Sequence, residues 1–207
     1  MFRIIRALRR EPAATPATVE APVPIDAPEV DLVVYSEDCV LSGHLSMPAE
    51  RLSDHLNGQE TFELLDVLVE TLVGDLPFRT HAVEVAREEI LFVHGGGPRG
   101  NPGRRLRTRQ HPIVVKTGPY EIRGYIHTMP GGEPLVSLRH RKPMLALTDA
   151  VIEFAVASAP QVQRVGVVIV NRDAVDWIVE GHDDEVAMPN MPVDTSGRLV
   201  KDFTGAS

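Results

Sequence analysis

The sequence contains one pattern twice. The segment Val33–Val93, which begins VVYSEDCVLSGHLSMP, is echoed by Val114–Ile178, which begins VVKTGPYEIRGYIHTMP. The offset between corresponding residues grows from 81 at the start of the pattern to 85 at its end. Such drift is expected where two copies of one fold have diverged through small loop insertions. A duplicated pattern of this length predicts two similar structural units in tandem.

Within each copy, apolar and polar residues alternate in short runs, which is typical of β-strands. We expect strands at 31–36, 39–47, 61–69, 81–87 and 89–94 in the first copy, and at 113–115, 121–128, 144–153, 162–170 and 174–179 in the second. A short helical turn is expected in AERLSDHLNG. The segment ALTDAVIEFAVASAP is also compatible with a helix, because Ala and Leu are strong helix formers. Its counterpart FELLDVLVETL favours a strand for both.

Composition divides the chain into six parts. We expect an amphipathic helix at 1–10, a Pro/Ala-rich linker at 11–30, the first repeat at 31–94, a Gly/Pro/Arg-rich connection at 95–111, the second repeat at 112–180 and a flexible tail at 181–207. The linker contains five prolines and favours an extended tether. Fully extended, it would reach about 60 Å.

The size of the copies predicts that they depend on each other. Each has about 65 residues, which is near the lower limit for an independently stable core. We therefore expect the copies to pack together or to oligomerise. The single cysteine, Cys39, lies in an alternating apolar pattern, which indicates a small core residue and suits a reducing cytoplasm. The net charge of -8 argues against general adhesion to nucleic acid or acidic membranes.

The first ten residues, MFRIIRALRR, have two distinct faces when placed on a helix. One face carries Met1, Ile4, Ile5 and Leu8 with Phe2 at its edge, and the opposite face carries Arg3, Arg6, Arg9 and Arg10. This pattern is typical of a helix that lies in an anionic membrane surface or docks into a groove of a protein partner. The alternative is a frayed terminus without a role.

The same arginines bear on localisation. Arg3 and Arg6 interrupt the apolar run that a secretory signal would need. No apolar run approaches the roughly 18 residues that span a bilayer. We therefore expect a cytoplasmic protein, peripheral on the inner face of the membrane if the N-terminal helix binds lipid.

Each copy resembles the Sm-like β-barrel family in the order of its elements and in three motifs. The matching positions are Gly43 and Gly124, where the second strand would bend, Asp66 and Asp149, which end an L-x-D element, and Arg87 and Arg172, which precede the closing strand. The chain is also similar to a group of bacterial proteins with an RLSDHLN-type segment. The resemblance implies two tandem antiparallel barrels, structural roles for these six residues, and ring formation through edge-strand pairing, including homo-oligomers.

Departures from the family count against RNA binding. RNA-binding members have Arg-Gly in the final turn, whereas Glu88 and Asp173 follow the arginines here. A carboxylate at this point repels phosphates. An alternative remains open in the connection, whose basic residues are either solvated or contact an anion or nucleic acid. These residues are Arg99, Arg104, Arg105, Arg107 and Arg109.

The sequence contains no recognisable catalytic, cofactor or metal motif. HGGG at 94–97 lacks the G-x-S-x-G element with which it would form an esterase site, and the eight histidines include no HExxH pattern. Our leading hypothesis is a non-enzymatic scaffold or adaptor without a cofactor or metal. It would assemble through tandem barrels and attach through its N-terminal helix to a membrane or a larger complex. The alternative is an RNA- or nucleotide-binding Sm-like regulator that uses the arginine-rich connection.

Overall fold

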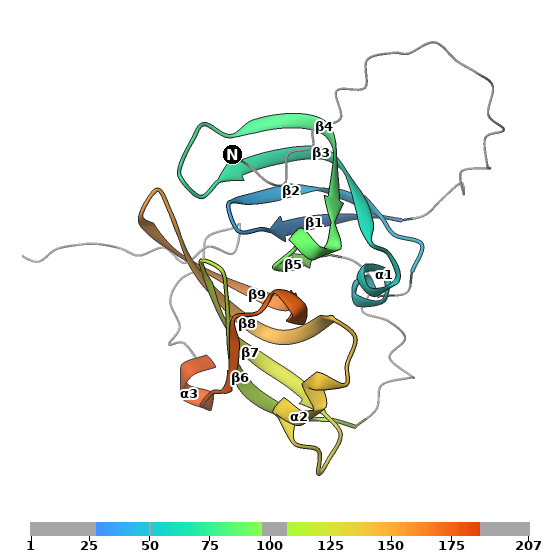
Figure 1. Ribbon diagram of the computed structural model, residues 1–207, viewed down its shortest axis with the longest axis vertical. Helices are drawn as coiled ribbons and strands as arrows, with labels where there is room; N and C mark the ends of the chain where they lie inside the picture. Colours follow the sequence, from blue (N-terminus) through green and yellow to red (C-terminus); the bar gives the residue numbers. More distant parts are fainter. Residues whose placement is uncertain (1–27, 50, 97–106, 187–207) are drawn as a thin grey trace, which may run out of the picture.

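The computed structural model describes residues 28–49, 51–96 and 107–186 (Figure 1). The fold is mainly β, which confirms the class expected from the alternating pattern. The expected N-terminal helix at 1–10, nearly all of the linker at 11–30 and most of the tail at 181–207 lie outside the described residues.

Both repeats contain two strands, a short helix, two strands, a 3-10 turn and a closing strand. The first repeat comprises β1 (Glu29–Tyr35), β2 (Cys39–Ser46), α1 (Leu52–Gly58), β3 (Thr61–Thr71), β4 (Phe78–Ala86), η1 (Arg87–Glu89) and β5 (Phe92–Gly95). The second comprises β6 (Arg109–Thr117), β7 (Tyr120–Thr128), α2 (Pro134–Arg139), β8 (Met144–Val156), β9 (Ala159–Asn171), η3 (Arg172–Ala174) and β10 (Trp177–Glu180), and α3 (Asp183–Val186) follows it. The segment that was also compatible with a helix, residues 146–160, forms most of β8, the turn after it and the start of β9.

Several boundaries differ from the sequence expectation, including β1, which begins at Glu29 inside the expected linker, and β5, which ends at Gly95 inside the expected connection. β6 begins at Arg109, inside the expected connection, because its first residues pair with the end of β7, starting with Arg109 opposite Thr128. The expected flexible tail begins with α3, which contacts β7 and β8 and buries Val186. The start of β6 and α3 gain regular structure because β7 offers a surface or an edge against which they pack.

The ten strands among the described residues form one antiparallel sheet in the order β10-β6-β7-β8-β9-β5-β1-β2-β3-β4. The two expected closed barrels are not shown, because the sheet runs continuously through both repeats and ends in β10 and β4. Figure 1 shows the first repeat above the second, with β5 between them.

Each repeat has a β-bulge at the same place. The pairing of β2 with β3 shifts register between Ser42 and His44, and Asp66 on β3 adopts a left-handed φ of 49°. The intervening Gly43 packs closely on β3, since a Cβ there would lie 2.8 Å from the carbonyl oxygen of Leu65. Such a bulge bends the strand, and a glycine permits the close approach.

The second repeat has the same irregularity. Register shifts between Arg123 and Tyr125, and Asp149 has a φ of 50°. The bulge therefore belongs to the architecture of the repeat.

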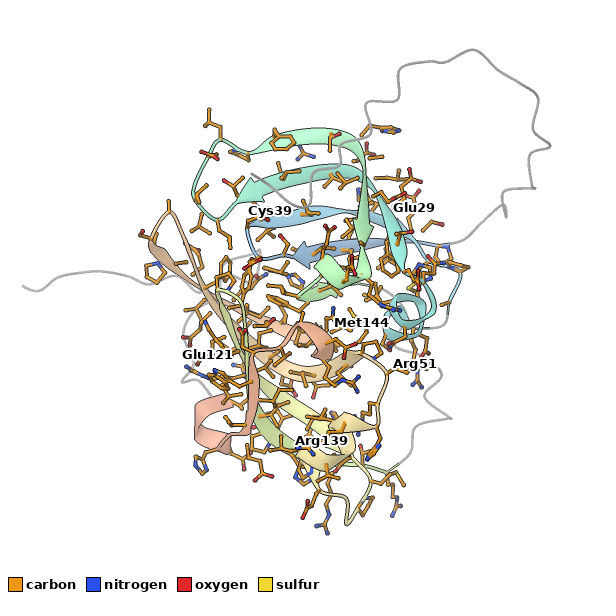
Figure 2. The ribbon with its side chains drawn as sticks, viewed as in Figure 1. Glu29, Cys39, Arg51, Glu121, Arg139 and Met144 are labelled. Atoms are coloured by element: carbon orange, nitrogen blue, oxygen red, sulfur yellow. The ribbon has the colours of Figure 1, made fainter. Side chains whose placement is uncertain are left out.

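The hydrophobic core consists of two clusters, and each cluster contains residues of both repeats. Leu32 and Val34 of β1 belong to the first cluster, whereas Tyr35 of the same strand belongs to the second. In the other direction, Met144 and Ile169 of the second repeat belong to the first cluster. Figure 2 shows Met144 between the two repeats. The repeats therefore bury apolar surface against each other, which offsets their small individual size.

Candidate functional site

The two repeats are joined by a strand pair that continues the sheet. β5 of the first repeat pairs antiparallel with β9 of the second, with Phe92 opposite Val170 and His94 opposite Val168. We call this strand pair and the side chains around it the internal junction. Its backbone hydrogen bonds satisfy strand edges that would otherwise be exposed.

An aromatic cluster fills one face of the internal junction. The ring of Tyr35 stacks on Phe92 with centroids 4.2 Å apart and planes 14° apart. Tyr120 contacts both rings edge-on, at 5.5 and 4.9 Å, and Phe154 lies 6.0 Å from Tyr35. Aromatic pairs in these arrangements contribute about 0.5 to 1.5 kcal/mol each beyond their buried area. Because the rings come from both repeats, the cluster holds the repeats together.

A polar trio lies beside the aromatic cluster. The hydroxyl of Tyr35 donates to Gln163 Oε1 at 2.7 Å and lies 3.0 Å from His94 Nε2. His94 Nε2 is also 3.1 Å from Gln163 Nε2. Burial lowers the pKa of His94 to about 4, so this imidazole is neutral at pH 7. The trio lines a hollow of about 210 Å³ between the repeats.

Two asparagine side chains tie the repeats together at the opposite end of the junction. Asn57 of α1 donates to the carbonyl of Met144 at 3.0 Å and accepts from the Met144 N–H at 3.1 Å. Asn171 of β9 donates to the carbonyls of Ile90 at 2.9 Å and Arg87 at 3.1 Å. Each amide satisfies backbone groups of the other repeat, as buried polar groups require.

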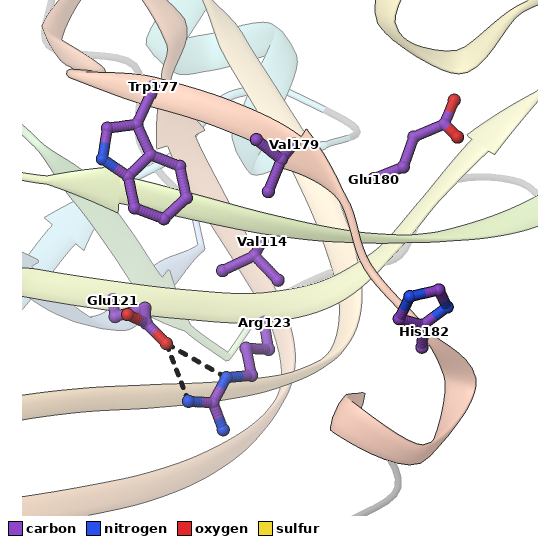
Figure 3. Close-up of a pocket in the computed structure, with 7 residues that line it drawn as sticks. All are labelled: Val114, Glu121, Arg123, Trp177, Val179, Glu180 and His182. Carbon is purple, nitrogen blue, oxygen red and sulfur yellow. Dashed lines mark hydrogen bonds and ion pairs between the residues drawn. The ribbon is translucent and has the colours of Figure 1, made fainter.

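The second repeat presents an open counterpart of the junction face. Strand register defines the correspondence: Trp177 lies opposite Lys116 as Phe92 lies opposite Tyr35. By the same rule, Val179 corresponds to His94. The residues around this face line a hollow of about 450 Å³, shown in Figure 3, which we call the open hollow. Its lining consists of Val114, Glu121, Arg123, Trp177, Val179, Glu180 and His182.

An ion-pair network forms part of the open hollow. Arg123 bridges Glu121 at 2.7 Å and Glu153 at 3.0 Å, and Figure 3 shows the bond to Glu121. The arginine and both carboxylates are partly buried, so their pairing limits the cost of covering them.

Exposed apolar side chains concentrate at the two ends of the sheet. Among the described residues, the exposed large hydrophobic side chains are Val73, Leu76, Phe78, Met129, Val136, Trp177 and Val179. Val73 and Leu76 lie in the turn of the hairpin that joins β3 to β4, Phe78 is the first residue of β4 in the same hairpin, and the last two lie on β10. Clustered apolar exposure of this kind marks an interaction surface.

The arginines expected to precede the closing strands bind backbone carbonyls. Arg87 donates to the carbonyl of Gln59 at 3.1 Å, and Arg172 donates to the carbonyl of Leu138 at 3.0 Å. Both guanidinium groups therefore hold the segments around the short helices. Asp66 lies 3.4 Å from His81 Nδ1 on the neighbouring strand.

The other expected site residues are only partly covered by the structure. Arg107 is exposed, and Arg109 is exposed at the start of β6. Arg99, Arg104 and Arg105 lie outside the described residues, as do the apolar and basic residues of the N-terminal helix. Of these residues, the two that the structure describes, Arg107 and Arg109, do not line the open hollow.

Sequence reasoning missed Tyr35, His94 and Gln163. Each occupies a position at which the copies differ, since Lys116, Val179 and Phe78 stand at the corresponding places. Divergence between the copies, set against their shared architecture, was the signal that could have identified them.

The described residues contain no group of three or more His, Cys, Asp or Glu side chains placed to hold a metal ion. Burial raises the pKa of the Cys39 thiol to about 11, so it remains protonated at pH 7. None of the described helices is long and apolar enough to cross a bilayer. Comparisons with models of protein families, with curated proteins and with solved structures each found no match.

Proposed function

We propose that this protein is a non-enzymatic scaffold or adaptor that assembles with copies of itself through the two end strands of its sheet. The observation that carries the proposal is the internal junction between β5 and β9. In the other repeat, β10 corresponds to β5 and β4 corresponds to β9, and these two strands are the ends of the sheet. Unpaired edges with apolar side chains promote strand addition. A chain that already joins two copies of one unit in this way has suitable surfaces for joining further units.

The resemblance to the Sm-like family supports the same proposal. The order of strands within each repeat, the bulge at Gly43 and Gly124, and the arginines before the closing strands all fit such a barrel. In this interpretation each repeat is one strongly bent barrel unit, and edge pairing such as that of β5 with β9 joins adjacent units.

Assembly is tested by measuring the mass of the full chain over a range of concentrations. Native mass spectrometry and sedimentation velocity should detect multiples of the 22.7 kDa chain that grow with concentration. A mass that stays at 22.7 kDa up to a chain concentration of roughly 100 μM, well above a micromolar dissociation constant, would contradict the proposal.

The second part of the proposal is attachment through the N-terminal helix. Phe2, Ile4, Ile5 and Leu8 would enter the acyl boundary or a partner's groove, and the arginines would contact anionic groups. Ten residues bind a bilayer weakly, so several copies in one assembly would be needed for stable attachment.

Co-sedimentation with anionic vesicles tests this attachment. The full chain should sediment with vesicles, and a chain without residues 1–10 should remain in solution. The variant Ile5→Glu retains the arginines and serves as the matched control for purely electrostatic binding. Equal sedimentation of all three proteins would contradict attachment to lipid and leave docking to a protein partner as the remaining route.

The exposed positions of Arg107 and Arg109 support a second candidate function. A connection with five arginines would contact RNA or nucleotide phosphates. Binding of single-stranded RNA should then weaken steeply with salt and be lost when Arg104, Arg105, Arg107 and Arg109 are changed to Ala. Retention of RNA by that variant would contradict this function.

A further inference from the structure

We propose that the hairpin joining β3 to β4 of one copy docks into the open hollow of a second copy, with β4 pairing antiparallel to β10. This inference rests on the proposed function and identifies the interface through which copies would join. Strand register gives the alignment. The internal pair Phe92–Val170 corresponds to Trp177 opposite Val85 between copies. In the same way, the internal pair His94–Val168 corresponds to Val179 opposite Val83.

The side chains at the two ends of the sheet match each other as a pair. At the internal junction, His94 and Gln163 are both polar and lie 3.1 Å apart. The corresponding residues at the ends are Val179 and Phe78, which are both apolar. If only one of the two positions were apolar at the ends, a polar side chain would face an apolar one. Because both are apolar, β10 of one copy and β4 of another are complementary here.

The exposure of the apolar side chains at the two ends of the sheet also supports a second copy as the occupant of the open hollow. Phe78, Trp177 and Val179 are 43%, 44% and 45% exposed, whereas Phe92 at the internal junction is 0% exposed. Leu76 at the hairpin tip is 91% exposed. A second copy would cover the residues at both ends with one type of contact, which buries apolar surface on each side.

The different side chains also keep the two contacts distinct. The Tyr35–Phe154 pair of the internal junction corresponds to Lys116 and Thr71 at the ends. A lysine cannot replace the stacked Tyr35 ring, so β10 of a second copy is a poor substitute for β5 against β9. Because β10 of a second copy fits poorly against β9, it does not displace β5 from the internal junction. Intact chains therefore join head to tail, and strands are not swapped between them.

Complementary surface variants provide the test. Phe78→Glu disables the hairpin, and Val179→Glu disables the open hollow. Each variant alone should self-assemble more weakly, with the dissociation constant of the assembly raised at least about tenfold, and should be monomeric at concentrations where the wild type assembles. Each still retains one intact surface, so an equimolar mixture should form a dimer and no larger species. Met129→Glu changes another exposed apolar residue away from both ends and should assemble like the wild type.

The outcomes separate this interface from assembly in general. If the wild type assembles and Phe78→Glu assembles equally well, the docking is wrong and the scaffold proposal stands. If folded wild type remains monomeric, both are wrong. If the mixture of variants gives no dimer although each variant is folded by circular dichroism, head-to-tail joining is wrong.

A cysteine pair tests the register directly. Val93 opposite Ile169 at the internal junction corresponds to Ile178 opposite Glu84 between copies. A chain with Glu84→Cys and Ile178→Cys should form disulfide-linked multimers under mild oxidation. The pair Ala82→Cys and Ile178→Cys is two residues out of register and should not. Equal cross-linking of both pairs would overturn the register.

Discussion

The hydroxyl of Tyr35 on β1 donates a hydrogen bond of 2.7 Å to Gln163 on β9, a residue 128 positions away in the other repeat. The same hydroxyl lies 3.0 Å from His94. Three residues from separate strands therefore satisfy one another where the repeats meet. Tyr35 therefore belongs both to the polar trio and to the aromatic cluster of the internal junction.

Tyr35→Phe should destabilise the chain by about 1 to 2 kcal/mol, because it keeps the stacked ring but leaves polar groups of His94 and Gln163 with one partner fewer. Urea unfolding followed by circular dichroism measures the change. Gln163→Met and the double variant complete a thermodynamic cycle, whose coupling energy should be near 1 kcal/mol. A coupling near zero would show that the bond does not stabilise the junction.

Stability should fall as the pH is lowered from about 6.5 towards 4. Burial lowers the pKa of His94 from 6.5 to about 4 in the folded chain. Well above pH 6.5 the imidazole is neutral in both states and has no effect. Below it, the unfolded chain binds a proton that the folded chain does not, which costs at most about 3 kcal/mol by pH 4. The variant His94→Gln should lose this part of the pH dependence, measured by urea unfolding at several pH values. An unchanged profile would assign the acid sensitivity to other groups.

Asn171→Ala should cost about 1 to 3 kcal/mol, because it leaves the carbonyls of Arg87 and Ile90 without their amide partner. Thermal unfolding measures the loss. The reverse change in the first repeat, Ala86→Asn, alters the corresponding position at the end strand and serves as the control. Similar effects of the two substitutions would contradict a specific role at the internal junction.

Gly43→Ala should destabilise by about 1 to 3 kcal/mol, because the new methyl group would lie 2.8 Å from the carbonyl oxygen of Leu65. Gly124→Ala should cost less, since the corresponding distance to Thr148 is 3.2 Å. Gly58→Ala meets nothing within 4 Å and provides the matched control. The midpoint of urea unfolding should rank the three in this order, and a larger loss for Gly58→Ala would contradict the packing argument.

The repeat and the alternation of side chains predicted most of the strands. Alternation is a local property, because burial of one face of a strand appears directly in successive residues. The ambiguous segment in β8 was resolved by comparison with β3 for the same reason. The start of β6 at Arg109 and the helix α3 were missed, because both depend on packing against β7, which lies elsewhere in the sequence.

The residues of the candidate site were less accessible to sequence reasoning. Tyr35 and His94 are separated by 59 positions, and Asn57 binds Met144 across 87. No local pattern reports contacts over such distances. Trp177 is 44% exposed beside the open hollow although its counterpart Phe92 is buried, a difference that the shared pattern of the two copies does not reveal.

Sequence alone therefore establishes that one β-rich unit occurs twice and locates the bends at which both copies carry glycine. The tertiary structure decides that the copies share one sheet through β5 and β9, with β4 and β10 as its ends. The physical reason is that backbone hydrogen bonds along a strand edge are nearly independent of side-chain identity. Which edges meet is decided by long-range packing of residues such as Tyr35 and Gln163, and that packing exists only once the chain has folded.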